Sequence, residues 1–170
     1  MQSAVVAALP DLRRWMSAKA RLHGHPAGRG LPWWDLVAPL PHAAAEVSWD
    51  QGVRVVRDAF GGYSAELAGV LDRALDERWI DAEPRAGKVG GAFCARLTGD
   101  RSLVLLNWSG SADSTQTTAH ELGHAYHNTA LADRTALQRQ LPMALAETAS
   151  IFCETLVVEE GLARAEGVDR

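Results

Sequence analysis

Apolar side chains recur along this chain mainly with a helical period, with one strand-like interruption near the middle. The first helical pattern covers residues 11–23 and is ended by Gly24 and Pro26. The next stretch, residues 25–41, is rich in Gly and Pro and is predicted to be a loop. Within this loop the aromatic cluster at residues 33–36 is predicted to pack on a core, as aromatic side chains in loops usually do.

Two further helices are predicted after the loop. Ser48 and Gln51 have the spacing of a capping box, in which each residue satisfies a backbone N–H of the other. The apolar residues that follow recur on one face as far as Gly61, which predicts a helix between these points. A second helix is predicted over residues 64–79.

The strand-like interruption follows these helices. Residues 89–97 and 101–108 are predicted to be two strands, and residues 98–100 have the composition of a turn between them. This pattern predicts a β-hairpin. The fold class predicted for the chain is therefore mainly α, of the α+β kind, with a small antiparallel β-hairpin or sheet.

The last two predicted helices flank a connecting segment. Asp113 and Gln116 are predicted to cap a helix that continues to about Ala130. Pro142 suits the first turn of a helix, because its missing N–H is not needed there, and this helix is predicted to reach Gly161.

Composition excludes several classes of function. The chain has 170 residues, of which 47% are hydrophobic, and can bury one sizeable core, so a single domain is predicted. Its net charge is −4 and its basic residues are scattered, which argues against a nucleic-acid partner. Residues 1–10 lack the basic start of a secretory signal, and no apolar run approaches the roughly 20 residues that span a bilayer, so no membrane partner is predicted. Cys94 and Cys153 lie in apolar stretches, as buried reduced thiols do, and predict a cytoplasmic location.

Two histidines one helical turn apart carry the candidate chemistry. His120 and His124 project from one face of the predicted helix, separated by about 40°. Such a pair can hold Zn²⁺ with nitrogen ligands at about 2.0–2.1 Å without backbone strain. Glu121 lies about 100° round the helix, off the ligand axis, and is predicted to be the catalytic base that activates a water.

A catalytic zinc needs a third protein ligand. The metzincin pattern would require a histidine at position 130, which is Ala130. Glu147, on the last predicted helix, is therefore predicted to be the third ligand, with Gly123 allowing the two helices to approach. Glu154, on nearly the same face, is predicted to accept a hydrogen bond from a ligand histidine and orient it. Both carboxylates have apolar neighbours, where an unpartnered charge is costly.

One other metal site can be rejected from the sequence, and two alternatives to a zinc peptidase cannot. Glu121 to His124 also matches half of a di-iron motif, but no histidine follows His127 to build the other half. His127 itself is predicted to pack rather than to bind metal. Two alternatives stay open: a structural helical module with incidental histidines, and a chain that binds zinc without catalysis.

The sequence resembles the oligoendopeptidase F branch of the thimet-oligopeptidase-like zinc peptidases. The similar segments, in the family's order, are residues 34–40 (WDLVAPL), 84–94 (PRAGKVGGAFC), 118–127 (TAHELGHAYH) and 146–150 (AETAS). The resemblance implies a zincin-like, mostly helical metallopeptidase core. It also implies one zinc ion held by His120, His124 and Glu147, with Glu121 as general base.

The same resemblance implies a deep channel that admits short unfolded peptides. An edge strand at residues 103–108 would pair with the peptide backbone, so the implied substrate-binding residues are Leu103, Leu105, Asn107 and Gly110.

Family members are several times longer than this chain, and a C-terminal part carries the His and Tyr residues that stabilise the oxyanion. Tyr63 and Tyr126, the only tyrosines here, lie elsewhere. Residues 1–170 are therefore expected to form a single partial domain, with a complementary peptidase fragment as a candidate partner.

The predicted function is zinc-dependent hydrolysis of short peptides by direct attack of water. The alternative is a truncated peptidase that binds zinc but is inactive, because an oxyanion donor contributes roughly 10²–10³ in rate. The isolated chain is accordingly expected to bind metal and to show little turnover.

Overall fold

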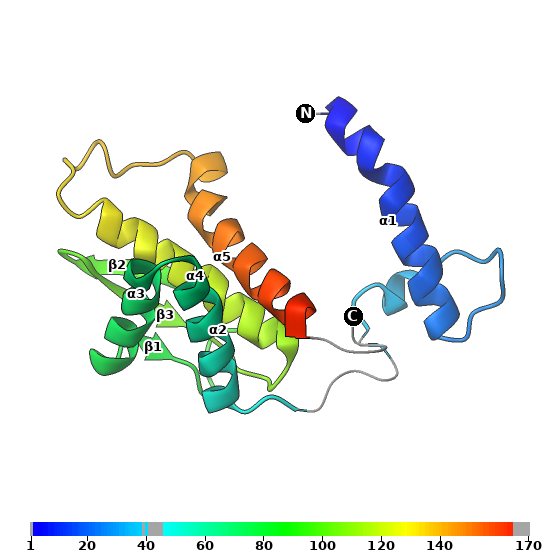
Figure 1. Cartoon of the computed structure of the whole chain (residues 1–170), viewed down its shortest axis with the longest axis horizontal. Helices are drawn as coiled ribbons and strands as arrows, with labels where there is room; N and C mark the ends of the chain where they lie inside the picture. The colour runs from blue at the N-terminus through cyan, green and yellow to red at the C-terminus, as the bar shows by residue number, and fades with distance from the viewer. Residues whose placement is uncertain (1, 39, 41–45, 165–170) are drawn as a thin grey trace. The chain divides into compact units, whose positions relative to one another are not determined.

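The computed structural model describes residues 2–38, 40 and 46–164. The chain divides into two compact units, Met1–Ala44 and Ala45–Arg170, which are described separately (Figure 1). The single partial domain expected from the sequence stays a prediction.

The first unit contains helix α1 (Gln2–Leu22) and the short 3-10 helix η1 (Trp33–Asp35). The predicted start at residue 11 is wrong, because α1 begins at Gln2 and includes Pro10. The residues before Pro10 are rich in alanine, the best helix former, which offsets the backbone hydrogen bond that a proline cannot donate.

Polar contacts hold the loop of this unit against its helix. The buried Lys19 donates from Nζ to the Leu36 carbonyl oxygen at 2.8 Å, and His25 Nε2 lies 2.6 Å from Asp35 Oδ2. Trp33 and Trp34 stack edge to face but are 80% and 62% exposed. The prediction that this aromatic cluster packs on a core is therefore wrong for these two side chains.

The second unit carries four helices that the sequence predicted, with changes at their ends. Ser48 Oγ accepts from Gln51 N, and the Gln51 side chain accepts from Ser48 N, which confirms the capping box. Asp113 is not a cap: Ser111 has the extended backbone and accepts from Ser114 N, so Asp113 already lies in the first turn. The helices are α2 (Trp49–Tyr63), α3 (Ala65–Asp76), α4 (Ala112–Ala130) and α5 (Met143–Arg164).

A three-stranded mixed sheet completes the second unit. Strands β2 (Phe93–Thr98) and β3 (Arg101–Leu105) form the predicted antiparallel hairpin. Strand β1 (Ile80–Asp81), which the sequence did not predict, pairs in parallel with β3 and gives the order β1-β3-β2. The strands are shorter than expected. Gly91 has a φ of 83°, which ends the regular pairing on the N-terminal side of β2.

Helix α4 lies at the centre of this unit, in contact with α5, α2 and both strands of the hairpin (Figure 1). The largest fully buried side chains of the second unit include Phe60, Leu71, Trp79 and Leu122. The mainly helical fold class is thus confirmed. Among the described residues, no helix is long and apolar enough to cross a membrane.

Both cysteines are free, as predicted, with Cys153 buried and Cys94 half-buried. Burial raises the pKa of the Cys94 thiol to about 11 and that of Cys153 to about 12. The thiols are therefore protonated at neutral pH, as expected of reduced cysteines in a core.

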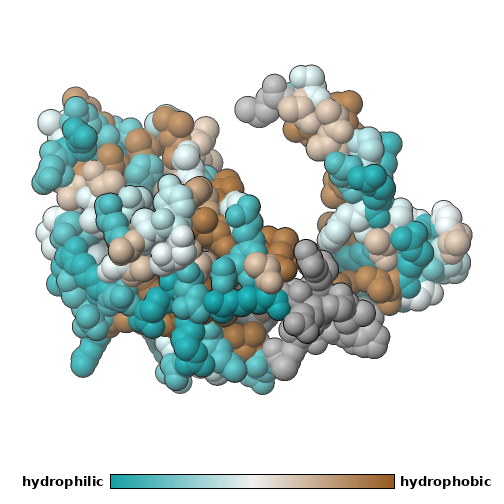
Figure 2. All heavy atoms as spheres, viewed as in Figure 1, coloured by the Kyte–Doolittle hydropathy of each residue, from teal (hydrophilic) through white to brown (hydrophobic). Residues whose placement is uncertain are grey.

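Helix α5 is apolar on two sides. Ser150, Cys153 and Val157 are buried on its inner side. Its outer side is also rich in apolar residues, since Leu145, Ile151 and Phe152 are 55%, 55% and 40% exposed. Brown, hydrophobic atoms are visible on the surface of the second unit in Figure 2. Hydrophobic periodicity alone therefore does not say which side of α5 faces α4.

Candidate metal centre

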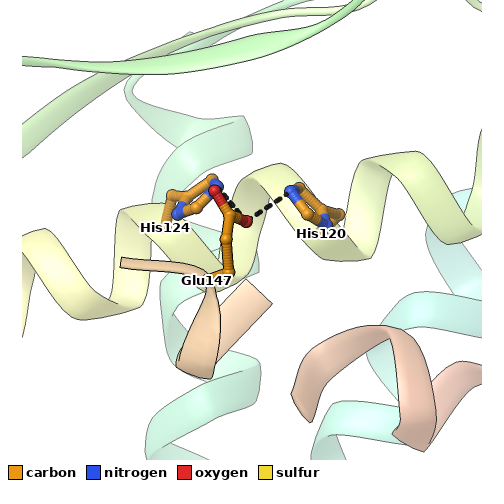
Figure 3. Close-up of side chains that lie close together, drawn as sticks. All are labelled: His120, His124 and Glu147. Atoms are coloured by element: carbon orange, nitrogen blue, oxygen red, sulfur yellow. Dashed lines mark ion pairs between the residues drawn. The ribbon is translucent and has the colours of Figure 1, made fainter. Parts of the chain in front are cut away.

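Three side chains from α4 and α5 converge on one point (Figure 3). Glu147 Oε2 lies 3.3 Å from His120 Nε2 and 3.4 Å from His124 Nε2, and one ligand atom from each residue lies within 4.8 Å of the others. Two ligands at about 2.0–2.1 Å from a tetrahedral zinc are about 3.3–3.4 Å apart. An N–H···O hydrogen bond would be shorter, at about 2.7–3.2 Å. The spacing therefore fits a shared metal ion better than direct hydrogen bonds.

Glycine at position 123 lets α5 approach α4 closely enough to deliver Glu147. A Cβ added to Gly123 would lie 2.6 Å from the Ala149 carbonyl oxygen and 2.7 Å from the Ser150 Cα. These are backbone atoms that no side-chain rotation can move. Any larger residue would push the helix that carries Glu147 away from the histidines.

The other nitrogen of His120 faces α5. Its Nδ1 contacts Glu154 Oε1, and Gln116 Nε2 donates to Glu154 Oε2 at 2.9 Å. A carboxylate on Nδ1 fixes the imidazole so that Nε2 points to the cluster and is available as a ligand. The structure thus places Glu154 beside His120, as the sequence predicted. Gln116 was predicted only as part of a helix cap and not as a site residue, although it lies one helical turn before His120 on the same face.

The Glu147 carboxylate has its own partner. Ser150 Oγ lies 2.8 Å from Glu147 Oε2 and 2.9 Å from the Glu147 carbonyl oxygen. Ser150 was not predicted as a site residue. The available signal was its position three residues after Glu147, which places both side chains on neighbouring faces of one helix.

Glu121 is buried beside the cluster. It is 5% exposed, and its Oε2 has no hydrogen-bond partner among the described residues. Burial raises the pKa of this carboxyl group, His120 opposes the shift, and the charge of Glu147 adds to it. A buried carboxylate oxygen without a partner is costly, which points to a role other than stability.

Burial also lowers the pKa of His124. A lower pKa favours the neutral imidazole, which is the form that binds metal.

An open pocket of about 530 Å³ gives access to these groups. One wall carries His120, Glu121, His124 and Glu147, and another carries residues of β2, including Phe93. His127 lines the same pocket but is not one of the three clustered donors. The arrangement has the parts of a hydrolytic site: a candidate metal centre, a buried carboxylate and room for an extended ligand.

Residues 63–169 match peptidase family M3. The chain belongs to this family. It is 31% identical over 127 residues to the chromosomal oligoendopeptidase F of Lactococcus lactis subsp. cremoris, which covers 74% of this chain and 21% of that protein. The resemblance seen in the sequence is thereby confirmed.

Solved structures show the same fold. A Bacillus anthracis str. Ames protein assigned as an oligoendopeptidase F superposes with a TM-score of 0.74 at 19% identity, over 91% of this chain and 28% of that chain. PZ peptidase A in complex with an inhibitor gives a TM-score of 0.74 at 13% identity, over 89% of this chain and 27% of that chain. The M3 chain described here spans 21% and 25% of the length of two of its curated relatives.

The implied substrate-binding strand is wrong for this M3 chain. Strand β3, which contains Leu103 and Leu105, is the central strand and is paired on both sides, so it has no free edge. The Asn107 side chain donates to two backbone carbonyl groups at 2.9 Å, and Gly110 O accepts from Val47 N. None of the four residues lines the pocket of the metal centre. The error arose because β1, only two residues long, has no pattern that reveals it.

Proposed function

We propose that this chain is the zinc-binding catalytic core of a peptidase that hydrolyses short peptides. The observation that carries the proposal is the convergence of three ligand atoms, in which the Glu147 carboxylate oxygen lies 3.3 and 3.4 Å from the two imidazole nitrogens, the spacing of tetrahedral zinc ligands. Membership of family M3 and similarity to an oligoendopeptidase F support a peptide as the substrate.

His120, His124 and Glu147 would hold the ion and leave a fourth position open to water or substrate. When bound, zinc supplies Lewis-acid polarisation of a carbonyl group and lowers the pKa of a bound water. The proposal needs neutral imidazoles, which the burial of His124 favours.

Glu121 is the proposed general base. Its buried oxygen takes a proton from the attacking water while the water oxygen forms a bond to the scissile carbonyl carbon. The carboxyl group then gives this proton to the amide nitrogen as the C–N bond breaks. One carboxyl group can perform both steps, because it returns to the carboxylate form when the proton leaves with the amine.

Strand β2 is the proposed docking edge for the peptide backbone. Among the described residues it pairs only with β3, so its other side is open, and Phe93, Cys94 and Arg96 line the pocket of the metal centre. A peptide added to this edge would extend along α4 past Glu121.

One observation favours a second function, zinc binding without catalysis. Tyr63 and Tyr126 line an adjoining pocket of about 520 Å³, which shares His127 and Leu141 with the pocket of the metal centre but does not include Glu121. Among the described residues no tyrosine therefore lines the pocket where an oxyanion would form. A missing oxyanion donor would lower the rate by roughly 10²–10³.

Zinc content and cleavage of a quenched peptide, measured in parallel on the 170-residue chain, separate these functions. Metal with turnover supports the peptidase, metal without turnover supports the second function, and a chain that binds no zinc overturns both. His124→Ala is expected to lose zinc.

Glu121→Gln is expected to keep zinc and to lose roughly 10²-fold or more in rate. Glu159→Gln, an exposed change on α5, is the control and should alter neither quantity. Full turnover by Glu121→Gln with full metal occupancy would contradict the assignment of the base.

A further inference from the structure

We infer that Ser150 is a positioning residue that aims the Glu147 carboxylate at the metal. The inference rests on the proposed zinc site and adds a residue to it. Ser150 Oγ donates to Glu147 Oε2, which is the same oxygen that faces both histidine nitrogens. A carboxylate oxygen has two lone pairs, so one can accept from Ser150 while the other is directed to the ion.

The hydroxyl group has a choice of acceptors. Ser150 Oγ lies within hydrogen-bond distance of both the Glu147 carbonyl oxygen and the Glu147 carboxylate. It carries a single proton, and a hydrogen bond to an ionised acceptor is roughly twice as strong as one to a neutral acceptor. The hydroxyl group therefore donates to the carboxylate. This contact differs from the usual hydrogen bond of a helical serine, which goes to a backbone carbonyl group of the preceding turn.

Thr155 shows that usual contact on the same helix. Its Oγ1 donates to the Ile151 carbonyl oxygen at 2.9 Å, and it has no other hydrogen bond among the described residues. Thr155 is exposed, whereas Ser150 is completely buried. The two hydroxyl groups thus differ in burial and in contact with the candidate centre, which makes Thr155 a matched control.

The carboxylate needs such a support. Glu147 is 41% exposed, so water competes for its oxygens and several rotamers are open to it. Ser150 is fixed in turn, because its Cα lies against Gly123 at the crossing of α4 and α5. Ser150 therefore packs at the crossing of α4 and α5 and also hydrogen-bonds to Glu147, the ligand that α5 contributes.

The test compares Ser150→Ala and Thr155→Ala in the full chain, with zinc affinity measured by competition against a chelator. Loss of a group that orients a ligand typically weakens metal binding by about 10–100-fold, so Ser150→Ala is expected to bind zinc at least about tenfold more weakly. Thr155→Ala is expected to bind zinc as the parent chain does. The visible spectrum of the Co²⁺-loaded chain should change for Ser150→Ala alone.

The unfolding free energy of the metal-free chain separates this role from a structural one. A residue that acts only in packing would lower stability and leave the zinc affinity of the folded fraction unchanged, which would overturn the inference. A second comparison is made in a Glu147→Gln background, where Ser150→Ala should cause no further loss of affinity; an equal further loss would also overturn it. If the parent chain itself binds no zinc, the proposed function fails. That result differs from the two outcomes that would overturn the role of Ser150, because both of them require a parent chain that binds zinc.

Discussion

Replacing Gly123 by alanine tests the contact between α4 and α5 on which the metal centre depends. The added Cβ would lie 2.6 Å from the Ala149 carbonyl oxygen, whereas ordinary contact begins at 3.4 Å. The two helices must therefore part by about 0.8 Å at this point. The obstacle is helix backbone, so a rotamer change cannot relieve it.

The expected loss of stability combines two opposing effects. Overpacking of this kind costs about 1–3 kcal/mol, and the higher helix propensity of alanine returns about 1 kcal/mol. We expect a net loss of up to about 2 kcal/mol in the unfolding free energy. A shift of about 0.8 Å also exceeds the roughly 0.2 Å tolerance of metal–ligand distances, so zinc affinity should fall at least about tenfold.

Urea unfolding of the metal-free chain and chelator competition measure the two effects. The matched control is Gly69→Ala, because Gly69 lies exposed inside α3 with no atom within 4 Å of an added Cβ. That variant should gain up to about 1 kcal/mol and keep its zinc affinity. If Gly123→Ala were as stable as Gly69→Ala and bound zinc normally, the close helix crossing described here would be refuted.

Two further predictions concern parts of the fold away from the metal centre. Ser48→Ala removes the hydroxyl group that accepts from Gln51 N, and should cost about 1 kcal/mol of unfolding free energy in urea titrations, with no change in zinc affinity. Arg85, followed by Lys88, lowers the pKa of Asp81 below its ordinary value of 3.8, so the folded carboxylate stabilises the chain at neutral pH, and this contribution is lost as the pH falls through the folded pKa. Asp81→Asn should therefore be modestly less stable than the parent chain at neutral pH and approach it in acid; a difference independent of pH would contradict this reasoning.

The parts of the site that the sequence predicted are those fixed by local geometry. His120, Glu121 and His124 lie within five residues of one helix, so helical spacing alone brings the two imidazoles to one face. The same holds for the capping box at Ser48, which needs only residues three apart. Placing Glu147 required a second step, since the need for a third ligand combined with the small residues around it to select one carboxylate.

What the sequence did not predict depends on contacts between distant segments. The edge of the sheet was misplaced because β1 has two residues and gains its partner, β3, only through the tertiary fold. Ser111 and Asp113, at the start of α4, both have side chains that can cap a helix, and backbone conformation rather than residue type decides between them.

The role inferred for Ser150 was hidden for a related reason, since α5 is apolar on two sides and its pattern does not show which side meets α4. Only the crossing at Gly123 reveals that Ser150 faces inward beside the Glu147 carboxylate.

The candidate centre therefore joins a local element to a tertiary one. The histidines are set by α4 alone, whereas the carboxylate reaches them only when α5 lies against Gly123. An ion bound by all three residues would favour the crossed arrangement by its differential affinity, about 2.7 kcal/mol at a free concentration of 100 Kd. Such a contribution is comparable with the overpacking cost of about 1–3 kcal/mol expected for an added methyl group at position 123. Metal binding and the packing of α5 on α4 would thus stabilise each other, so side chains that permit the crossing are as necessary to the centre as its ligands.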